Sequence, residues 1–182
     1  MDMPKIRPKP IRTKGKDVDS KLLAWITSIR EWEIVEDWKF GLPRGEKIVI
    51  PKGFVFDGAS IPRILWAILS PTGLLLIQGL IHDYGYRYDY IWIYDSNGVA
   101  YKGHKNAGQD YWDNFFYEVG YEVNGIRALN RLAWVALTLF GKFAWEKNCK
   151  KRPKEPKLYP EGPIRPEDDN RYSNQNRNFI QC

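Results

Sequence analysis

A histidine and an aspartate stand side by side where an apolar stretch near the middle of the chain ends. The chain has only two histidines, and the first of them, His82, is followed directly by Asp83. Six of the eight residues in 74–81 are leucine or isoleucine. A polar group buried without a partner costs roughly 2–7 kcal/mol. The sequence therefore predicts that residues elsewhere in the fold bind this pair.

The spacing of the polar residues around His82 predicts a general-base site. In a helix, Tyr86 lies one turn after His82 on the same face, whereas Asp83 points about 100° away. The loop over 89–103 allows the next predicted helix to return antiparallel, which places Asp110 opposite His82. An aspartate that holds one imidazole nitrogen fixes the tautomer, so the other nitrogen can take a proton from water. The expected base is therefore His82, with Asp110 as its orienting acid.

Asp83 points away from this face and is a candidate ligand for a hard cation. Together with the backbone carbonyls of residues 57–61, its carboxylate offers the oxygen ligands that such cations prefer. A bound cation would polarise the carbonyl or phosphoryl oxygen of a substrate. A nucleophilic triad of Ser60, His82 and Asp110 is disfavoured, because Ser60 lacks the Gly-x-Ser-x-Gly elbow of such enzymes.

Each of these residues also has a purely structural interpretation. His82 can be a core histidine whose hydrogen bonds are satisfied, and Asp83 can be an ordinary surface acid. Asp57 can form a turn ahead of the next helix by accepting hydrogen bonds from backbone N–H groups. The second histidine, His104, stands beside Lys105 near a predicted helix start and is expected to be solvated. The sequence leaves the catalytic and the structural interpretations open.

The elements that would position these residues predict an α+β fold. Alternating apolar residues favour strands, and apolar residues that recur every three to four positions favour helices. The pattern changes near Pro62, which indicates a short antiparallel β-meander followed by a helical bundle. The expected strands cover 31–35, 48–50 and 54–56, with a turn at 42–45 and a small hairpin within 89–103; the expected helices cover 19–30, 62–69, 74–88, 104–121 and 124–147.

Charge and proline content divide the chain into one domain and two arms. Residues 1–16 contain six Lys/Arg, one acid and three prolines, which predicts a basic extended arm. Residues 17–148 are mildly acidic and are expected to form the single α+β domain. Residues 149–182 are expected to form a second arm, with five prolines within 153–166 and an Asn/Arg-rich end.

The arms favour protein partners over nucleic acid. An arm that binds nucleic acid interleaves Lys/Arg with stacking aromatic residues, whereas residues 1–16 contain no aromatic residue. Proline-rich arms of this kind order on contact with neighbouring subunits. The longest uncharged apolar run, 132–141, has ten residues, and a spanning helix needs about 20, so we expect no membrane span. Residues 1–16 contain no apolar core, so we expect no signal peptide. Two cysteines, Cys149 and Cys182, are too few for a disulfide framework or a metal-ligand cluster.

The helix that carries His82 resembles the catalytic helix of the secreted phospholipase A2 class, including its disulfide-free viral members. In that class a His-Asp-x-x-x-Tyr helix faces a second helix that bears an aspartate. The glycine-rich calcium loop of that class is not matched, because residues 57–60 contain one glycine. The resemblance therefore implies either no cation or a cation with Asp57 as a further ligand. It implies four other roles, with His82 as base, Asp83 as calcium ligand, Tyr86 as hydrogen-bonding support and Asp110 as orienting acid.

A longer resemblance rests on three blocks of residues that occur in order along the chain. They are Gly53-Phe54-x-x-Asp57-x-Ala59-Ser60-Ile61-Pro62, then His82-Asp83-x-x-Tyr86, then a helix with an acid near Asp110. These blocks resemble a phage-encoded family known as domain of unknown function 1353. The resemblance extends over roughly 32–120 and implies a phage or prophage origin with no established activity.

We therefore expect a phage virion component of the tail, neck or baseplate, present in the host cytoplasm during assembly and then in the virion. Its partners would be other phage structural subunits, contacted through residues 1–16 and 149–182. The alternative is a cation-dependent hydrolase of ester or amide bonds in lipid or cell envelope, with His82 as base and Ca²⁺ as the candidate cation. The two hypotheses are compatible, because a particle can carry a hydrolase that breaches the envelope.

Overall fold

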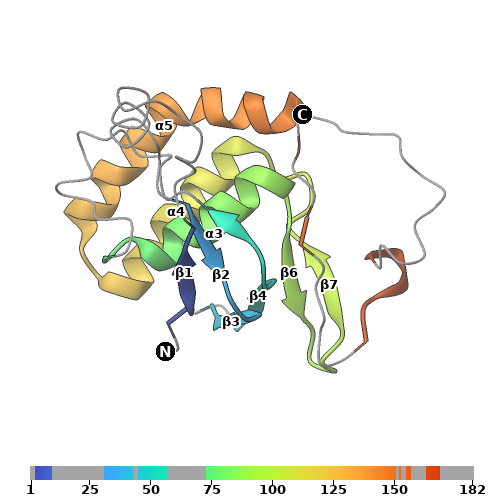
Figure 1. The fold of residues 1–182 in the computed structure, drawn as a ribbon. Helices are drawn as coiled ribbons and strands as arrows, with labels where there is room; N and C mark the ends of the chain where they lie inside the picture. The colour runs from blue at the N-terminus through green and yellow to red at the C-terminus, as the bar shows by residue number, and fades with distance from the viewer. Residues whose placement is uncertain are drawn as a thin grey trace, which may run out of the picture.

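The chain has the α+β fold that the sequence predicts, and its described residues form two antiparallel sheets and three α-helices (Figure 1). The helices are α3 (Leu76–Tyr88), α4 (Gln109–Asn124) and α5 (Arg127–Lys150), and a short 3₁₀ helix, η1 (Pro166–Asp168), follows them. The computed structural model describes residues 3–9, 31–42, 45–56, 73–150, 152, 155–156 and 163–168. The helices expected over 19–30 and 62–69 lie outside these residues, as do Asp57 and Ser60.

Within the described residues, seven short strands form the two sheets. One sheet has the order β1–β2–β5 and the other has the order β3–β4–β6–β7, and all paired strands are antiparallel. The strands are β1 (Ile6–Pro8), β2 (Trp32–Ile34), β3 (Trp38–Gly41), β4 (Lys47–Ile50), β5 (Val55–Phe56), β6 (Ile91–Tyr94) and β7 (Ala100–Gly103).

The predicted hairpin within 89–103 is confirmed as the β6–β7 pair. At its tip, Asp95 Oδ1 accepts hydrogen bonds from the backbone N–H groups of Asn97 and Val99, each at 2.9 Å. Gly98 has a φ of 75°, a left-handed conformation that glycine adopts without a steric penalty. The strand β3 was not predicted, and it lies between the expected strand at 31–35 and the expected turn at 42–45. At that turn the backbone N–H of Gly45 donates to the carbonyl oxygen of Leu42 at 2.9 Å.

The helix that carries the His-Asp pair, α3, is the central helix of the fold. Eleven of its 13 residues are buried, and it contacts β5, β6, α4 and α5. The α4 helix runs antiparallel to it: Gln78, early in α3, lies near Gly120 late in α4, and Gly85, late in α3, lies against Trp112 early in α4. The predicted antiparallel return of the second helix is therefore confirmed.

The α4 helix begins at Gln109, five residues later than the sequence predicts. The backbone is left-handed at His104 (φ 53°), Asn106 (φ 56°) and Gly108 (φ 82°), and such residues cannot continue a right-handed helix. The backbone N–H of Gly108 donates to Asp89 Oδ1 at 3.0 Å. This acid, at the end of α3, therefore fixes the point where α4 starts.

The described parts of both predicted arms belong to the domain. Residues 6–8 form β1 and pair along the edge of β2. At the other end, Ile164 forms a parallel bridge with Ala100 of β7, held by two backbone hydrogen bonds of 2.8 Å. Arm residues therefore form one outer strand, β1, and bridge to another, β7.

Candidate functional site

Side chains from α3 and α4 meet in one buried hydrogen-bonded group, called the His82 network here. Asp113 Oδ1, on α4, lies 2.8 Å from His82 Nε2 and 2.5 Å from the Tyr86 hydroxyl, both on α3. The other carboxylate oxygen of Asp113 lies 3.5 Å from Gln109 Nε2. His82 and Asp113 are each only 2% exposed. One carboxylate thus binds both polar side chains on the same face of α3.

The structure brings together two of the three residues predicted for catalysis, His82 and Tyr86, but the acid that contacts them is not the predicted one. His82 and Tyr86 share a face, with ring centroids 4.0 Å apart. Their common acid is Asp113, whereas Asp110 lies in the first turn of α4 and is exposed. Residues three apart on a helix share a face, so the sequence identified the correct face of α4 and an acid one turn too early on it.

The α5 helix closes the network from the side of Tyr86. A Cβ atom placed on Gly141 would lie 2.4 Å from the Tyr86 hydroxyl oxygen, so only glycine permits this approach. The indole of Trp145 packs edge-on against the Tyr86 ring, with centroids 5.3 Å apart. Burial and the hydrogen bond to Asp113 raise the pKa of Tyr86 above its ordinary value of 10.0. The phenol therefore stays neutral and donates to Asp113.

The geometry of the network suits a general base and equally suits a satisfied core histidine. If His82 Nε2 donates to Asp113, the Nδ1 nitrogen of the neutral ring carries no proton and can accept one. The carboxylate also stabilises the imidazolium that proton transfer creates. The same contacts join α3 to α4 and satisfy the buried polar groups. Catalysis by His82 therefore stays a prediction after the geometry is known.

Asp83 is buried at 6% exposure, so the interpretation of this residue as an ordinary surface acid is wrong. The other candidate cation ligand, Asp57, lies outside the described residues. Among the residues that the structure does describe, no group of three or more His, Cys, Asp or Glu side chains could hold a metal ion. The described residues do not fit a Ca²⁺ site on their own, and we derive no chemical step through a cation.

The second histidine forms a separate cluster that the sequence did not predict. His104 Nε2 lies 3.2 Å from Glu46 Oε2, and its Nδ1 lies 2.9 Å from the Tyr111 hydroxyl. The His104 and Tyr111 rings stack with centroids 5.4 Å apart. The expectation of a solvated His104 is therefore wrong. Glu46 is 58 residues away in the chain, so no local pattern could have revealed the pair.

A third polar cluster fastens the C-terminal segment to the domain. Glu155 Oε1 accepts hydrogen bonds from the Tyr84 hydroxyl at 2.5 Å and from Trp92 Nε1 at 2.7 Å. Burial, together with the charge of Glu155, raises the pKa of Tyr84 and of Tyr90. Burial lowers the pKa of Lys102, whose ammonium lies 4.4 Å from the Tyr90 ring centroid. The carboxylate and these aromatic side chains thus anchor the segment at 155.

Comparison with known proteins bears on the region that contains the His82 network. A family described as "Protein of unknown function (DUF1353)" matches residues 32–137, which is more than half of the chain. The chain belongs to this family. The DUF1353 region runs from the start of β2 into α5 and includes all residues of the His82 network. The family resemblance inferred from the sequence blocks is therefore confirmed, and it extends beyond residue 120.

Part of the chain is similar to a protein of no stated activity. "Uncharacterized protein y4jT" of Sinorhizobium fredii (strain NBRC 101917 / NGR234) is 40% identical over 55 residues, which are 29% of this chain and 16% of that protein. The chain thus spans a small part of the length of this relative. No solved structure matches the chain. In the described part of the chain, no helix is long and apolar enough to cross a membrane.

Proposed function

We propose that the protein is a hydrolase of ester or amide bonds in lipid or cell envelope, with His82 as general base and Asp113 as its orienting acid. The observation that carries the proposal is the shared carboxylate oxygen, Asp113 Oδ1, at 2.8 Å from His82 Nε2 and 2.5 Å from the Tyr86 hydroxyl. This contact fixes the imidazole tautomer and leaves Nδ1 for proton transfer.

In the proposed reaction His82 Nδ1 takes a proton from water while the water oxygen bonds to the carbonyl carbon of the substrate. The proton then passes to the leaving alcohol or amine as its bond to carbon breaks, and the products are an acid and an alcohol or amine. Asp113 stabilises the transient imidazolium, and Tyr86 holds Asp113 in place. Since His82 is 2% exposed, the proposal includes a local opening that admits water and substrate.

Replacement of His82 by glutamine should abolish hydrolysis while the fold is kept. The glutamine amide can still donate to Asp113, but it cannot act as a base, so turnover should fall by about 10²- to 10⁴-fold. The measurement is hydrolysis of short- and long-chain nitrophenyl esters, fluorogenic phospholipids and purified peptidoglycan. Assays with Ca²⁺ and with EDTA would show in the same experiment whether turnover requires a cation.

His104→Gln is the matched control, because it removes the only other histidine and leaves the His82 network untouched. It should retain full turnover. Thermal unfolding of both variants shows whether each is folded. Failure of the wild type to hydrolyse any of these substrates, or wild-type turnover by His82→Gln, would contradict the proposal and leave His82 as a structural residue.

The basic, proline-rich termini support a second proposal, that the protein assembles into a phage particle. Residues 6–8 and 163–168 bind the chain's own sheets. The remaining residues of the two arms, such as 169–182, would therefore make the contact with other subunits of the particle.

Deletion of 169–182 should leave a folded domain, because the described sheets and helices use residues up to 168. The deletion should also remove the protein from particles, measured by immunoblotting of particles purified from an induced host. Incorporation of the truncated protein at the wild-type level would rule out a role of 169–182 in assembly.

A further inference from the structure

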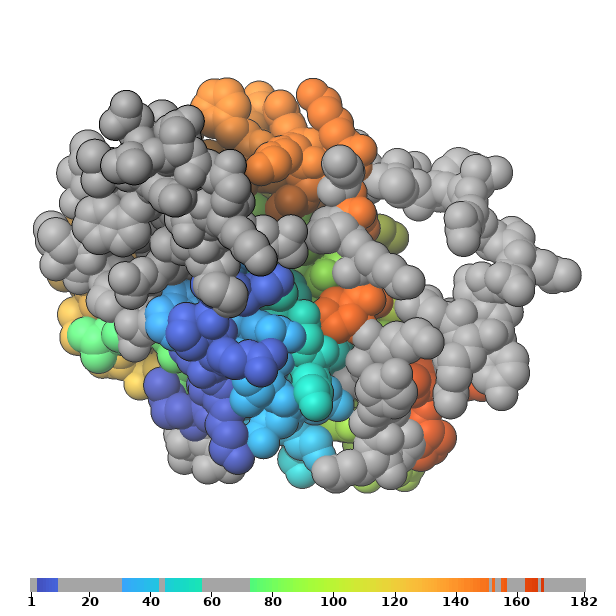
Figure 2. Space-filling view, viewed as in Figure 1, coloured from blue at the N-terminus to red at the C-terminus, as the bar shows by residue number. Residues whose placement is uncertain are grey.

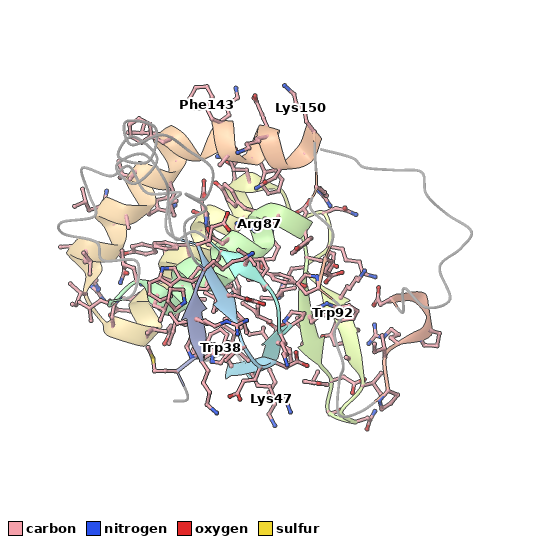
Figure 3. All side chains as sticks on the ribbon, in the orientation of Figure 1. Trp38, Lys47, Arg87, Trp92, Phe143 and Lys150 are labelled. Carbon is pink, nitrogen blue, oxygen red and sulfur yellow. The ribbon has the colours of Figure 1, made fainter. Side chains whose placement is uncertain are left out.

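The α5 helix presents large apolar side chains to solvent along one face. Nine large apolar side chains are exposed among the described residues, and five of them lie on this helix. Leu139 is 66% exposed and Phe143 is 77% exposed, and Phe143 projects away from the body of the molecule (Figure 3). The five residues, called the outer face of α5 here, are Leu132, Val135, Leu139, Phe140 and Phe143.

The outer face is a continuous stripe. Leu132, Val135, Leu139 and Phe143 follow each other at spacings of three or four, so they lie on one side of the helix. The opposite side, with Ala133, Leu137 and Gly141, is buried against the rest of the fold. Figure 2 shows α5, in orange, along the upper edge of the molecule. A helix with one buried side normally carries polar residues on the other, and α5 departs from this pattern.

The charged residues of α5 indicate which partner covers the stripe. The helix exposes five cations, at Arg127, Arg131, Lys142, Lys147 and Lys150, and one acid, Glu146. The acid lies 4.0 Å from Lys142, so its charge is locally balanced. Lys150 projects from the same side of the molecule as Phe143 (Figure 3). An exposed apolar stripe flanked by cations is the pattern of helices that lie in the surface of an anionic membrane.

We propose that the outer face of α5 docks onto an anionic membrane surface, with the helix parallel to the plane of the bilayer. The apolar stripe enters the boundary between headgroups and acyl chains, and the flanking cations bind anionic headgroups. A second copy of the chain is a poorer partner, because pairing two α5 helices would bring five cations of each copy together at close range.

The position of α5 gives this docking a consequence for the His82 network. The buried side of the helix contacts the Tyr86 hydroxyl through Gly141, while the outer face points the opposite way. A docked α5 would therefore lie between the His82 network and the lipid surface. The membrane contact itself does not depend on catalysis, so it is tested by binding alone.

The test is flotation of the full-length chain with vesicles of phosphatidylglycerol and phosphatidylcholine, beside vesicles of phosphatidylcholine alone. The wild type should bind the anionic vesicles, and added salt should weaken the binding. The double variant Leu139→Gln/Phe143→Gln should lose at least about tenfold in apparent affinity, because two large side chains no longer enter the bilayer. Both side chains are exposed, so the variant should unfold at the wild-type temperature.

The matched control is Met3→Gln/Leu74→Gln, which removes two exposed apolar side chains that are distant from α5 in the sequence and are 57% and 58% exposed. It should bind like the wild type. Three results would overturn the proposal: no binding of the wild type to anionic vesicles, equal binding by the Leu139/Phe143 variant, or self-association of the wild type that the Leu139/Phe143 variant abolishes in the absence of vesicle binding. The last result would assign the outer face to a second copy of the chain.

Discussion

Replacement of Gly85 by alanine should lower the free energy of unfolding by about 2–3 kcal/mol, which is a typical cost of overpacking a core. Gly85 lies on α3 directly against the indole of Trp112 on α4. A Cβ atom at this position would lie 2.2 Å from Cε3 of the Trp112 indole, closer than two carbon atoms can approach. Either the indole or one of the two helices must therefore move.

The Trp112 ring has no free direction in which to move. It is completely buried, and its Nε1 donates to Asp89 Oδ1 at 2.9 Å. The same carboxylate oxygen accepts the backbone N–H of Gly108 at the start of α4. A displaced indole would therefore lose its hydrogen bond and disturb the start of the helix, so we expect the clash to separate α3 from α4.

Gly79→Ala is the matched control, because Gly79 lies on the same helix and no described atom lies within 4 Å of a Cβ built there. Alanine favours a helix over glycine, so this variant should gain about 0.5–1 kcal/mol. Urea unfolding followed by circular dichroism measures both variants. Equal stability of the two would mean that α3 and α4 do not meet at Gly85.

The contrast between the two glycines shows what a sequence pattern does not contain. Gly79 and Gly85 both lie inside the same predicted helix, and glycine inside a helix is expected to lower helix stability by the same small amount at each position. They differ only through Trp112, 27 residues later in the chain. The sequence predicted where this helix lies along the chain and that His82 and Tyr86 share one of its faces. It could not predict which residue of α4 would lie opposite Gly85.

The same limit explains the misplaced acid. The i, i+4 spacing placed His82 and Tyr86 on one face, because that relation depends only on helix geometry. Whether Asp110 or Asp113 lies opposite His82 depends on the position of α4 along the axis of α3. The Gly85–Trp112 contact and the late start of α4 set this position. Local periodicity carries no information about the axial position of one helix relative to another.

The arms were predicted from composition, and composition could not reveal that they pair with the sheets. The strand β1 contains one proline and one basic residue, Pro8 and Arg7, and an edge strand tolerates both. Its partner β2 supplies the backbone hydrogen bonds. At the C-terminal end, Glu155 Oε1 accepts hydrogen bonds from Tyr84 on α3 and Trp92 on β6, which lie 71 and 63 residues earlier in the chain. Such long-range contacts leave no mark in the local sequence.

Replacement of Asp113 by alanine should lower the free energy of unfolding by about 3 kcal/mol or more, because it leaves two buried donors without their acceptor and each costs about 1–3 kcal/mol. The donors are His82 Nε2 and the Tyr86 hydroxyl, which share one oxygen of Asp113. Asp110→Ala is the matched control on the same helix, and its exposed side chain should change stability by no more than about 0.5 kcal/mol. Thermal and urea unfolding measure both variants.

Asp113→Asn then separates the structural role of the network from the proposed catalytic role. The amide oxygen can still accept both hydrogen bonds, so this variant should keep most of the stability that alanine loses. It carries no negative charge to stabilise an imidazolium, so a hydrolase that uses His82 as base should lose at least about tenfold in turnover. An asparagine variant with full stability and reduced turnover would mark the network as catalytic. Full stability with unchanged turnover would mean that the carboxylate serves only to join α3 to α4, and the base would have to be sought elsewhere in the chain.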